Sequence, residues 1–487
     1  MSATQETVME FTQVIAGERM AASRGEWIDV RCPSDGAVFA RVPRGGERDV
    51  DAAVAAARRA FDGAWGATPA AERGRTLRRL GALVEENLGE LADLESRDTG
   101  KPLRQGIADV RACARYFEFY GSAADQLLGD TIPVPGPFLA LTLREPHGVV
   151  AGVIPWNYPA QILGRVAGSA LAAGNALVVK PAEDACLSVV RIAELALEAG
   201  IPAGAFNVVT GLGGEAGAAL SGNGDIDFVT FTGSPATGSA IQAAASRRNL
   251  GTTMELGGKS PQVVFADADL DAAVPVIVNA IIQNGGQTCS AGSRVLVERS
   301  VHEALRERLV DVFSRLEAGP HDGDHDLGAI INPRQLERIR AMTDRAKQDG
   351  ARLVAEGRIA EGAPKGGFYC KPMLFDGAAP RSELGQDEVF GPVLAMFAFD
   401  DEEDAVSLAN GTQYGLVAGV WTGDAKRSIR VAKRMRAGQV YVNGYGAGGG
   451  IELPFGGFGR SGHGREKGFE GLVHMTQSKT IVVNHDG

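Results

Sequence analysis

From Gly148 onward, the sequence alternates short runs of apolar, often β-branched residues with longer stretches of helical periodicity. Up to Gly258 the apolar runs read VVAGVIPW, ALVVKP, FNVVTG, FVTFTG and TTMELGG. Such alternation is typical of a parallel sheet that helices cover on both faces. The 148–258 region is therefore predicted to form a doubly wound α/β domain, a fold that commonly binds a dinucleotide.

A second α/β pattern extends from Pro261 to about Phe455, with predicted strands at SPQVVF, SRVLVE, PMLF and VLAMFAF. Helical spacing dominates 51–65 and 70–94. Two β-like segments, 126–144 and 478–484, have no helical partner and need a sheet edge elsewhere, for example on another subunit. The predicted fold class is α/β, with two doubly wound Rossmann-like domains and a small β domain, because 487 residues exceed a single core.

Composition excludes several classes of partner. A net charge of −11 without a basic run argues against nucleic acid and anionic membranes. Five widely spaced cysteines fit a reducing compartment. The N-terminus has no secretory pattern, and the most apolar window, 166–179, is too short to span a bilayer, so a cytoplasmic protein is expected. No metal site is expected, since His321 and His325 lie in a glycine-rich, acidic segment.

Cys289 stands in GGQTCSAGSR, between small and polar residues. A lone cysteine is usually a small buried hydrophobe, but these neighbours are poor core material. We expect an accessible sulfur beside free backbone N–H groups, which would lower the pKa of the thiol and make it a nucleophile.

Two further polar residues follow predicted strands. Glu255, in TTMELGGKSP, is either a member of a structural ion pair or a desolvated general base. Asn157, in VIPWNYP, is either a cap or turn residue or a neutral donor to a developing oxyanion.

The segment FTGSPATG reads as a strand, a glycine turn and a helix start, with Ser234 as N-cap and Pro235 at the first helical position. A helix start of this kind suits a pyrophosphate. The nearby GLGGEAG is only a weak glycine fingerprint. Lys180 and Glu183 follow another strand, where an acid can accept both hydrogen bonds of a ribose diol. Because the same acid would repel a 2′-phosphate, NAD is favoured over NADP.

Together, the blocks PWNYP, LAAGNALVVKPAE, FTGS, MELGGKSP, GQTCSAG, EVFGPVL and LPFGGFGRSGHGRE resemble the aldehyde dehydrogenase superfamily in order and spacing. The resemblance covers essentially the whole chain and points to the hydrolytic, non-phosphorylating type. It implies that Cys289 attacks the aldehyde, that Asn157 and the Cys289 N–H hold the oxyanion, and that hydride passes to the nicotinamide. Glu255 would activate the water that hydrolyses the thioester, and Glu466 would assist proton relay.

The resemblance also implies a cofactor site and a division into domains. The expected cofactor residues are Ile154, Trp156, Lys180, Glu183, Gly213, Gly217, Gly233, Ser234, Leu256, Glu388 and Phe390. The expected domains are an NAD-binding domain (1–124 and 147–256), a catalytic domain (257–465) and an oligomerisation hairpin with the C-terminal strand (125–146 and 470–487). The oligomerisation hairpin and the C-terminal strand imply a homodimer or homotetramer.

Two alternatives stay open. A CoA-acylating relative of the same fold would transfer the acyl group to CoA, although such relatives generally lack the glutamate that stands here at 255. A catalytically silent member would be a structural protein, although silent members usually lose the nucleophile.

The expected substrate tunnel contains Tyr158, Arg165, Thr288, Ser290 and Tyr445. By resemblance, an arginine at 165 binds the distal carboxylate of succinate semialdehyde and also occurs in enzymes of aromatic aldehydes. Against the former, those semialdehyde enzymes often have a small residue in place of Glu183. The glycine-rich 446–450 stretch disfavours an aromatic cage for a quaternary ammonium. A semialdehyde or an aromatic aldehyde is the expected substrate.

Overall fold

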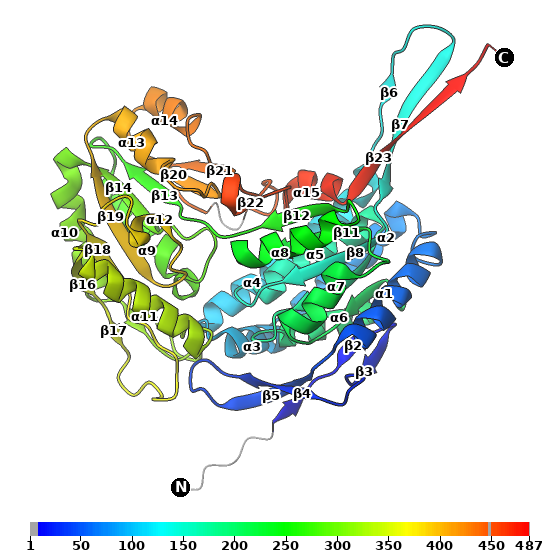
Figure 1. Ribbon diagram of the computed structural model, residues 1–487, viewed down its shortest axis with the longest axis horizontal. Helices are drawn as coiled ribbons and strands as arrows, with labels where there is room; N and C mark the ends of the chain where they lie inside the picture. Colours follow the sequence, from blue (N-terminus) through cyan, green and yellow to red (C-terminus); the bar gives the residue numbers. More distant parts are fainter. Residues whose placement is uncertain (1–7, 447–449, 487) are drawn as a thin grey trace.

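The computed structural model describes residues 8–446 and 450–486. Two α/β lobes stand side by side, and a narrow sheet projects from one of them (Figure 1). Within the described ranges, no helix combines the length and the apolar character that crossing a bilayer requires.

The first lobe is built on an eight-stranded sheet with the order β22-β12-β11-β8-β9-β10-β2-β3. Its strands are β2 (Gln13–Ile15), β3 (Glu18–Met20), β8 (Val149–Ile154), β9 (Ala176–Pro181), β10 (Phe206–Val208), β11 (Phe228–Thr232), β12 (Gly251–Glu255) and β22 (Gly462–His463). The five central strands are parallel and correspond to the five apolar runs of the 148–258 region. The strand order reverses between β8 and β11. A doubly wound sheet binds its ligand at such a reversal, beyond the carboxyl ends of the strands.

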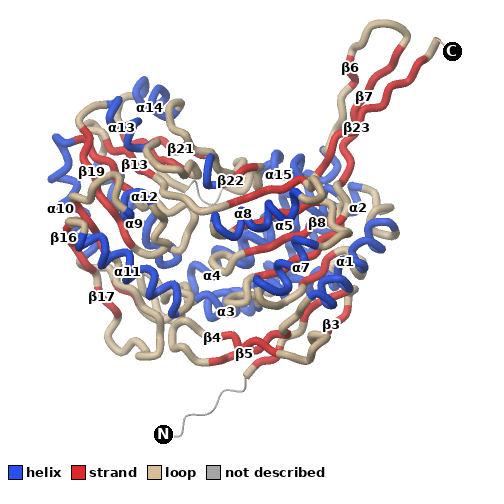
Figure 2. Tube along the Cα trace, viewed as in Figure 1, coloured by secondary structure: helices blue, strands red, loops and turns tan. Residues whose placement is uncertain are grey.

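Helices cover both faces of this sheet, as the fully buried β8, β9 and β11 require (Figure 2). One face packs against α2 (Ala70–Glu86), α3 (Leu88–Thr99), α4 (Leu103–Ala123), α5 (Pro159–Ala173) and α6 (Leu187–Glu198). The other face packs against α1 (Glu47–Asp62), α7 (Ala218–Gly222) and α8 (Pro235–Ser246). Below the lobe, a small sheet contains β1 (Met9–Glu10), β4 (Trp27–Arg31) and β5 (Val38–Pro43).

The second lobe has a seven-stranded sheet with the order β16-β18-β19-β14-β13-β20-β21. Its strands are β13 (Pro261–Val264), β14 (Arg294–Glu298), β16 (Arg352–Glu356), β18 (Met373–Asp376), β19 (Val393–Phe399), β20 (Val417–Trp421) and β21 (Gln439–Val442). Its helices are α9 (Leu270–Ile282), α10 (His302–Phe313), α11 (Pro333–Gln348), α12 (Glu383–Gln386), α13 (Glu402–Ala409) and α14 (Ala425–Ala432). A two-stranded ladder of β15 (Glu317–Ala318) and β17 (Arg358–Ile359) lies at its edge.

The projecting sheet contains the two β segments that have no helical partner in the sequence. It is formed by β6 (Thr131–Ile132), β7 (Phe138–Pro146) and β23 (Thr476–Asn484), and β23 follows the short helix α15 (Gly468–His474). β23 pairs with β7 in antiparallel register along its whole length, from Thr476 opposite Pro146 to Asn484 opposite Phe138. The sheet therefore joins residues near the C-terminus to a hairpin from the first third of the chain.

The two large sheets meet end to end at the segment that follows Glu255. β12 ends there, and the chain enters the second lobe at β13. The carboxyl ends of the first sheet thus face the amino ends of the second. The expected division into domains stays a prediction. One strand does not follow its boundaries: β22 falls within the expected catalytic domain (257–465) but pairs with β12 in the first lobe.

Candidate active site

Two cavities meet between the lobes. A cleft of about 540 Å³ runs along the carboxyl ends of β8, β9, β11 and β12. A smaller cavity of about 140 Å³ lies between α5 and the start of β20 and β21. Only Asn157 and Cys289 belong to the described linings of both. A molecule in either cavity therefore reaches the same sulfur and the same amide.

The loop before Cys289 owes its shape to three successive residues with left-handed backbone. The φ angles of Asn284, Gly285 and Gly286 are 50°, 61° and 74°. A Cβ on Gly286 would lie 2.1 Å from the carbonyl oxygen of Gly391, so only glycine fits there. Gln287 holds the loop from the other side, since its Oε1 accepts a 2.9 Å hydrogen bond from the Ile331 N–H.

The Cys289 side chain is half-buried, whereas the other four cysteines are buried, and all five are free thiols. Burial raises the pKa of the Cys289 thiol to about 12, and the charge of Arg165 only partly opposes this. The expected lowered pKa is therefore wrong for this structure, because desolvation outweighs the nearby positive charges. The expected position of the sulfur in an open loop stays consistent with the two cavities.

Asn157 lies between β8 and α5, and Tyr158 with Pro159 starts the helix. Its side-chain Nδ2 donates a 2.9 Å hydrogen bond to the Gln287 carbonyl, which places the amide beside the cysteine loop. Its own carbonyl accepts hydrogen bonds from Lys101 Nζ at 2.9 Å and Asn284 Nδ2 at 2.8 Å. Asn157 is thus held by both lobes.

Lys101 is a fully buried cation behind Asn157. Its Nζ lies 2.5 Å from Asp109 Oδ2 and 3.4 Å from Glu95 Oε1, and 4.5 Å from the centre of the Tyr158 ring. Glu95 in turn accepts a 2.6 Å hydrogen bond from Ser188 Oγ. This network connects α3, α4 and α6 to the start of α5.

Glu255 ends β12 and is 1% exposed. Both carboxylate oxygens lack a hydrogen-bond partner among the described residues. Burial, and next the charge of Glu466, raise the pKa of Glu255 well above its usual range, while Arg165 lowers it. Of the two roles left open, a structural ion pair does not fit a carboxylate without a partner. The carboxyl group is instead desolvated, which is the condition that the second role, a general base, requires.

The two glycines after Leu256 allow close packing around Glu255. A Cβ on Gly257 would lie 2.3 Å from Glu388 Oε2, and one on Gly258 would lie 2.4 Å from the Cys289 carbonyl oxygen. The backbone of this segment therefore touches both the cysteine loop and the cleft.

Glu466 and Arg165 form a buried ion pair behind the site, 2.6 Å between Oε2 and Nε. Thr230 Oγ1 donates a 2.9 Å hydrogen bond to the other oxygen of Glu466, and Arg165 Nη2 donates to Thr232 Oγ1 at 3.3 Å. Glu466 belongs to neither described cavity lining, whereas Arg165 faces the smaller cavity.

The far end of the large cleft carries the predicted ribose-binding pair. Lys180 is buried at the end of β9, and its Nζ lies 2.9 Å from Glu183 Oε2. Glu183 Oε1 accepts a 3.3 Å hydrogen bond from the Gly213 N–H. Burial acts to raise the pKa of Glu183, but Lys180 and these hydrogen bonds outweigh burial and hold that pKa below its usual range. Glu183 is therefore an anion at neutral pH.

Between this pair and Cys289, α8 begins at the cleft. Ser234 is its N-cap, whose Oγ accepts from the Thr237 N–H, and Pro235 follows as predicted. At the near end, Glu388 Oε1 accepts a 3.0 Å hydrogen bond from the Gly258 N–H, and burial raises the pKa of Glu388 to about 7. The Trp156 and Phe390 rings meet edge to face at 5.4 Å.

These features correspond to a known family. The aldehyde dehydrogenase family model matches residues 20–481. The chain belongs to the aldehyde dehydrogenase family. The hydroxyisobutyraldehyde dehydrogenase of Mycolicibacterium austroafricanum is 41% identical over 473 residues, 94% of this chain and 92% of the relative.

Solved structures agree with this assignment. A putative aldehyde dehydrogenase from Burkholderia cenocepacia has 58% identity and a TM-score of 0.97, over 97% of this chain and 100% of that one. The aldehyde dehydrogenase of Bacillus cereus, solved with NAD+, has 38% identity and a TM-score of 0.95, over 98% and 97%. The predicted family, α/β fold class and enzyme class are confirmed.

The predicted site residues of this aldehyde dehydrogenase gather around the two cavities, with three exceptions. The described lining of the cleft includes Ile154, Trp156, Asn157, Lys180, Glu183, Gly213, Gly233, Ser234, Glu255, Cys289, Glu388 and Phe390. That of the small cavity includes Asn157, Tyr158, Arg165, Thr288, Cys289, Ser290 and Tyr445. Gly217, Leu256 and Glu466 lie outside both. Of the 446–450 stretch, 447–449 lie outside the described residues.

Sequence reasoning missed two groups of lining residues. Lys467 and Phe455 border the small cavity. Lys467 was missed although its neighbour in the sequence, Glu466, was predicted as a site residue. Residues 334, 335 and 338 of α11 border the cleft: Gln335 Nε2 donates to the Phe390 carbonyl and Arg338 to that of Glu388. In the sequence, the polar face of α11 cannot be told from a solvent-exposed helix face. Only the packing of α11 shows that this face borders the cleft.

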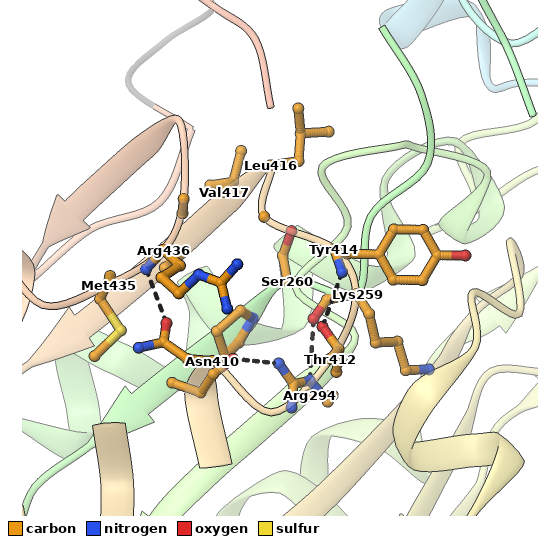
Figure 3. A pocket seen from close by; sticks show the side chains of 15 residues that line it. Lys259, Ser260, Arg294, Asn410, Thr412, Tyr414, Leu416, Val417, Met435 and Arg436 are labelled. Carbon is orange, nitrogen blue, oxygen red and sulfur yellow. Dashed lines mark hydrogen bonds between the residues drawn. The ribbon is translucent and has the colours of Figure 1, made fainter. Parts of the chain in front are cut away.

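Figure 3 shows a third, very small cavity of about 10 Å³ at the amino ends of β13 and β20. Arg294 dominates it, donating hydrogen bonds to the carbonyls of Lys259, Leu408 and Ala409 at 3.0, 2.9 and 2.8 Å. The Lys259 side chain extends away from this cavity. The hydrogen bond from Arg294 to the Lys259 carbonyl anchors the segment that follows Gly258.

Proposed function

We propose that this chain oxidises an aldehyde to the carboxylic acid with NAD as the oxidant, through a thioester on Cys289 that water hydrolyses. The observation that carries the proposal is that Cys289 and Asn157 line both cavities. An aldehyde in the small cavity and a nicotinamide in the cleft would therefore meet at one sulfur.

The cleft has the donor set that NAD requires. Glu183 and Lys180 would hold the adenine ribose, because an anionic acid accepts from a diol and repels a 2′-phosphate. The N-terminus of α8 would face the pyrophosphate, and Glu388 would hold the nicotinamide ribose. When bound, NAD accepts the hydride that leaves the substrate carbon. The NAD+ complex of the Bacillus cereus relative supports this choice of cofactor.

In the first step, the Cys289 thiol gives its proton to water in the cleft, the sulfur forms a bond to the carbonyl carbon, and the carbonyl π electrons move to the oxygen. The Asn157 amide has two N–H groups, one of which donates to the Gln287 carbonyl. The other, with the Cys289 N–H, would stabilise the oxyanion of the thiohemiacetal. The positive charges of Arg165 and Lys467 favour the attacking thiolate.

In the second step, loss of hydride re-forms the carbonyl and leaves a thioester. Glu255 would take a proton from water while the water oxygen attacks the acyl carbon. The C–S bond then breaks, and Cys289 leaves as thiolate. Because the pKa of Glu255 is raised, its carboxylate is a stronger base than an exposed one.

Glu466 acts in this proposal through Glu255 and not on the substrate. Its negative charge raises the pKa of Glu255, and its ion pair fixes Arg165. Proton relay by Glu466, implied by resemblance, stays a prediction.

Two experiments test the proposal against its alternatives. Cys289→Ala should abolish aldehyde-dependent NADH formation, and undiminished turnover would remove Cys289 from the mechanism. In a stopped-flow assay of the wild-type enzyme, CoA should not accelerate deacylation. Acyl-CoA as product would instead favour the CoA-acylating alternative, and a total lack of turnover would favour a silent member.

A short, polar aldehyde is the substrate that the small cavity supports, a range that includes semialdehydes and single-ring aromatic aldehydes. The relative named for hydroxyisobutyraldehyde supports a substrate of this size.

We also infer a homo-oligomer in the cytoplasm. The projecting sheet exposes apolar side chains that a monomer would leave in water, among them Leu139 at 47%, Val482 at 57% and Val483 at 47%. A second copy of the chain that covers this sheet would form a dimer or tetramer. Five free thiols fit a reducing compartment.

A further inference from the structure

The loop that carries Cys289 is contacted by a tyrosine hydroxyl on each side of the nucleophile. The Tyr158 hydroxyl lies 2.7 Å from Thr288 Oγ1. The Tyr445 hydroxyl donates a 2.7 Å hydrogen bond to the Ser290 carbonyl. Thr288 and Ser290 are the residues directly before and after Cys289. The two hydroxyls therefore hold the nucleophile through both of its neighbours in the chain.

These two tyrosines come from different lobes (Figure 1). Tyr158 lies between β8 of the first sheet and α5, whereas Tyr445 follows β21 at the edge of the second sheet. Lys101 Nζ lies 4.5 Å from the centre of the Tyr158 ring, and the centres of the Tyr441 and Tyr445 rings are 5.9 Å apart. Each ring is thus packed within its own lobe, and the cysteine loop is held from both lobes at once.

Both hydroxyl protons are used inside the protein. Thr288 Oγ1 donates to the Gln283 carbonyl at 3.4 Å, which leaves the Tyr158 hydroxyl as the donor to Thr288. The Tyr445 proton goes to the Ser290 carbonyl. Burial raises the pKa of both tyrosines, so both keep their protons near neutral pH. Because a tyrosine has one proton to donate and an aldehyde oxygen only accepts, neither hydroxyl is free to bind that oxygen.

Contacts of the backbone complete the hold on this loop. The Gln287 carbonyl accepts from Asn157 Nδ2, and the Cys289 carbonyl lies against Gly258, where a Cβ would be 2.4 Å away. Each residue from 287 to 290 is therefore in contact with another segment through its carbonyl or its side chain. The Cys289 side chain is the one that borders both cavities.

We propose that the hydroxyls of Tyr158 and Tyr445 are positioning groups that fix the Cys289 loop, so that the sulfur meets the aldehyde carbon in attacking geometry. The inference rests on the proposed function, since it concerns the nucleophile of that reaction. Attack requires the reacting atoms to be held about 3–3.5 Å apart, and a misplacement of about 1 Å can cost 10²-fold in rate. A loop without regular structure needs such fixed points, whereas a helix or strand would supply them itself.

The test removes each hydroxyl and separates the rate of acylation from the binding of the aldehyde. NADH formed in the first turnover is followed by stopped flow for Tyr158→Phe and Tyr445→Phe, at saturating NAD and over a range of propanal or benzaldehyde concentrations. The rate constant at saturating aldehyde should fall roughly tenfold in each variant and to a similar extent with both aldehydes. The aldehyde concentration that gives half of this rate should change less than about twofold, because the hydroxyls hold the loop and not the substrate.

Three further variants serve as matched controls, and thermal unfolding checks that each variant is folded. Thr288→Val removes the acceptor of the Tyr158 proton, so Tyr158→Phe/Thr288→Val should be no slower than the slower single variant. Thr288→Ser keeps the hydroxyl and should restore most of the rate that Thr288→Val loses. Tyr441 borders the same cavity, but its hydroxyl donates to Gln439 Oε1 at 2.9 Å. Any effect of Tyr441→Phe should therefore be confined to the half-saturating aldehyde concentration.

Three results would overturn the inference. The first is an unchanged first-turnover rate constant in both tyrosine variants. The second is a loss confined to the half-saturating aldehyde concentration, which would make the hydroxyls substrate contacts. The third is a double variant whose loss is the product of the two single losses. In each case NADH formation that Cys289→Ala abolishes would leave the proposed function standing. Absence of NADH from the wild-type enzyme with every aldehyde would instead contradict the proposed function itself.

Discussion

Replacing Lys101 by methionine tests how far Asn157 depends on the buried network behind it. The ammonium of Lys101 lies between Asp109 and Glu95 and donates to the Asn157 carbonyl at 2.9 Å. Methionine has a similar length without charge or donor. The variant therefore leaves two buried carboxylates without their cation and leaves Asn284 as the remaining donor to that carbonyl.

Two effects of different size follow. Breaking a buried ion pair by removing one partner costs about 3–5 kcal/mol of unfolding free energy. Burial raises the pKa of Asp109 to about 6, and Lys101 opposes this rise, so without Lys101 the carboxyl titrates higher still. Because the folded-state pKa then exceeds the unfolded one, the stability of Lys101→Met should increase as the pH falls through the raised folded-state pKa toward the unfolded value of about 3.9. For catalysis, complete loss of an oxyanion donor costs about 10²–10³ in kcat, and a displaced donor should cost roughly 10–100-fold.

The assay combines chemical denaturation with steady-state NADH formation, and Lys101→Met/Asp109→Asn is the matched control. The double variant removes one of the uncompensated carboxylates, so it should regain part of the stability. It does not restore the donor to Asn157, so kcat should stay low. An unchanged kcat in folded Lys101→Met would refute the positioning role of Lys101. So would a full recovery of kcat in the double variant, since stability alone would then explain the loss.

Glu255→Gln should keep a burst of NADH from acylation while steady-state kcat falls roughly 10²–10⁴-fold, and loss of the burst itself would contradict a role confined to hydrolysis. Because the pKa of Glu255 is raised and catalysis needs its carboxylate form, wild-type kcat should increase with pH. Glu466→Gln removes a charge that raises this pKa, so the increase should move to lower pH in kcat–pH profiles. Glu183→Ser should shift the kcat/KM ratio of NAD to NADP toward NADP on the order of tenfold, and an unchanged ratio would argue against charge repulsion at that ribose. Val482→Asp should shift the molar mass from light scattering to a smaller species, while an unchanged mass would place the subunit contact elsewhere.

Much of the fold was predictable because its signals are local. The five apolar runs of 148–258 became β8 to β12, and the orphan segments at 126–144 and 478–484 became β7 and β23 of one sheet. That these two segments belong together followed only from the family resemblance, because periodicity identifies a strand without identifying its neighbour. The same limit explains β22, a two-residue strand that only its contact with β12 creates.

The site shows the same division between local and non-local information. The sequence by itself determined the family: a cysteine between small residues, a glutamate after a strand, an asparagine before a helix, and a capped helix start near a second strand that ends in a lysine and an acid. These depend on residue type and neighbours along the chain. Only the tertiary structure decided the electrostatics. The pKa of the Cys289 thiol is raised and not lowered, Glu466 pairs with Arg165, and Lys467 faces the smaller cavity. The physical reason is that desolvation and Coulomb energy depend on distances in space, and the residues that set them here are far apart in sequence.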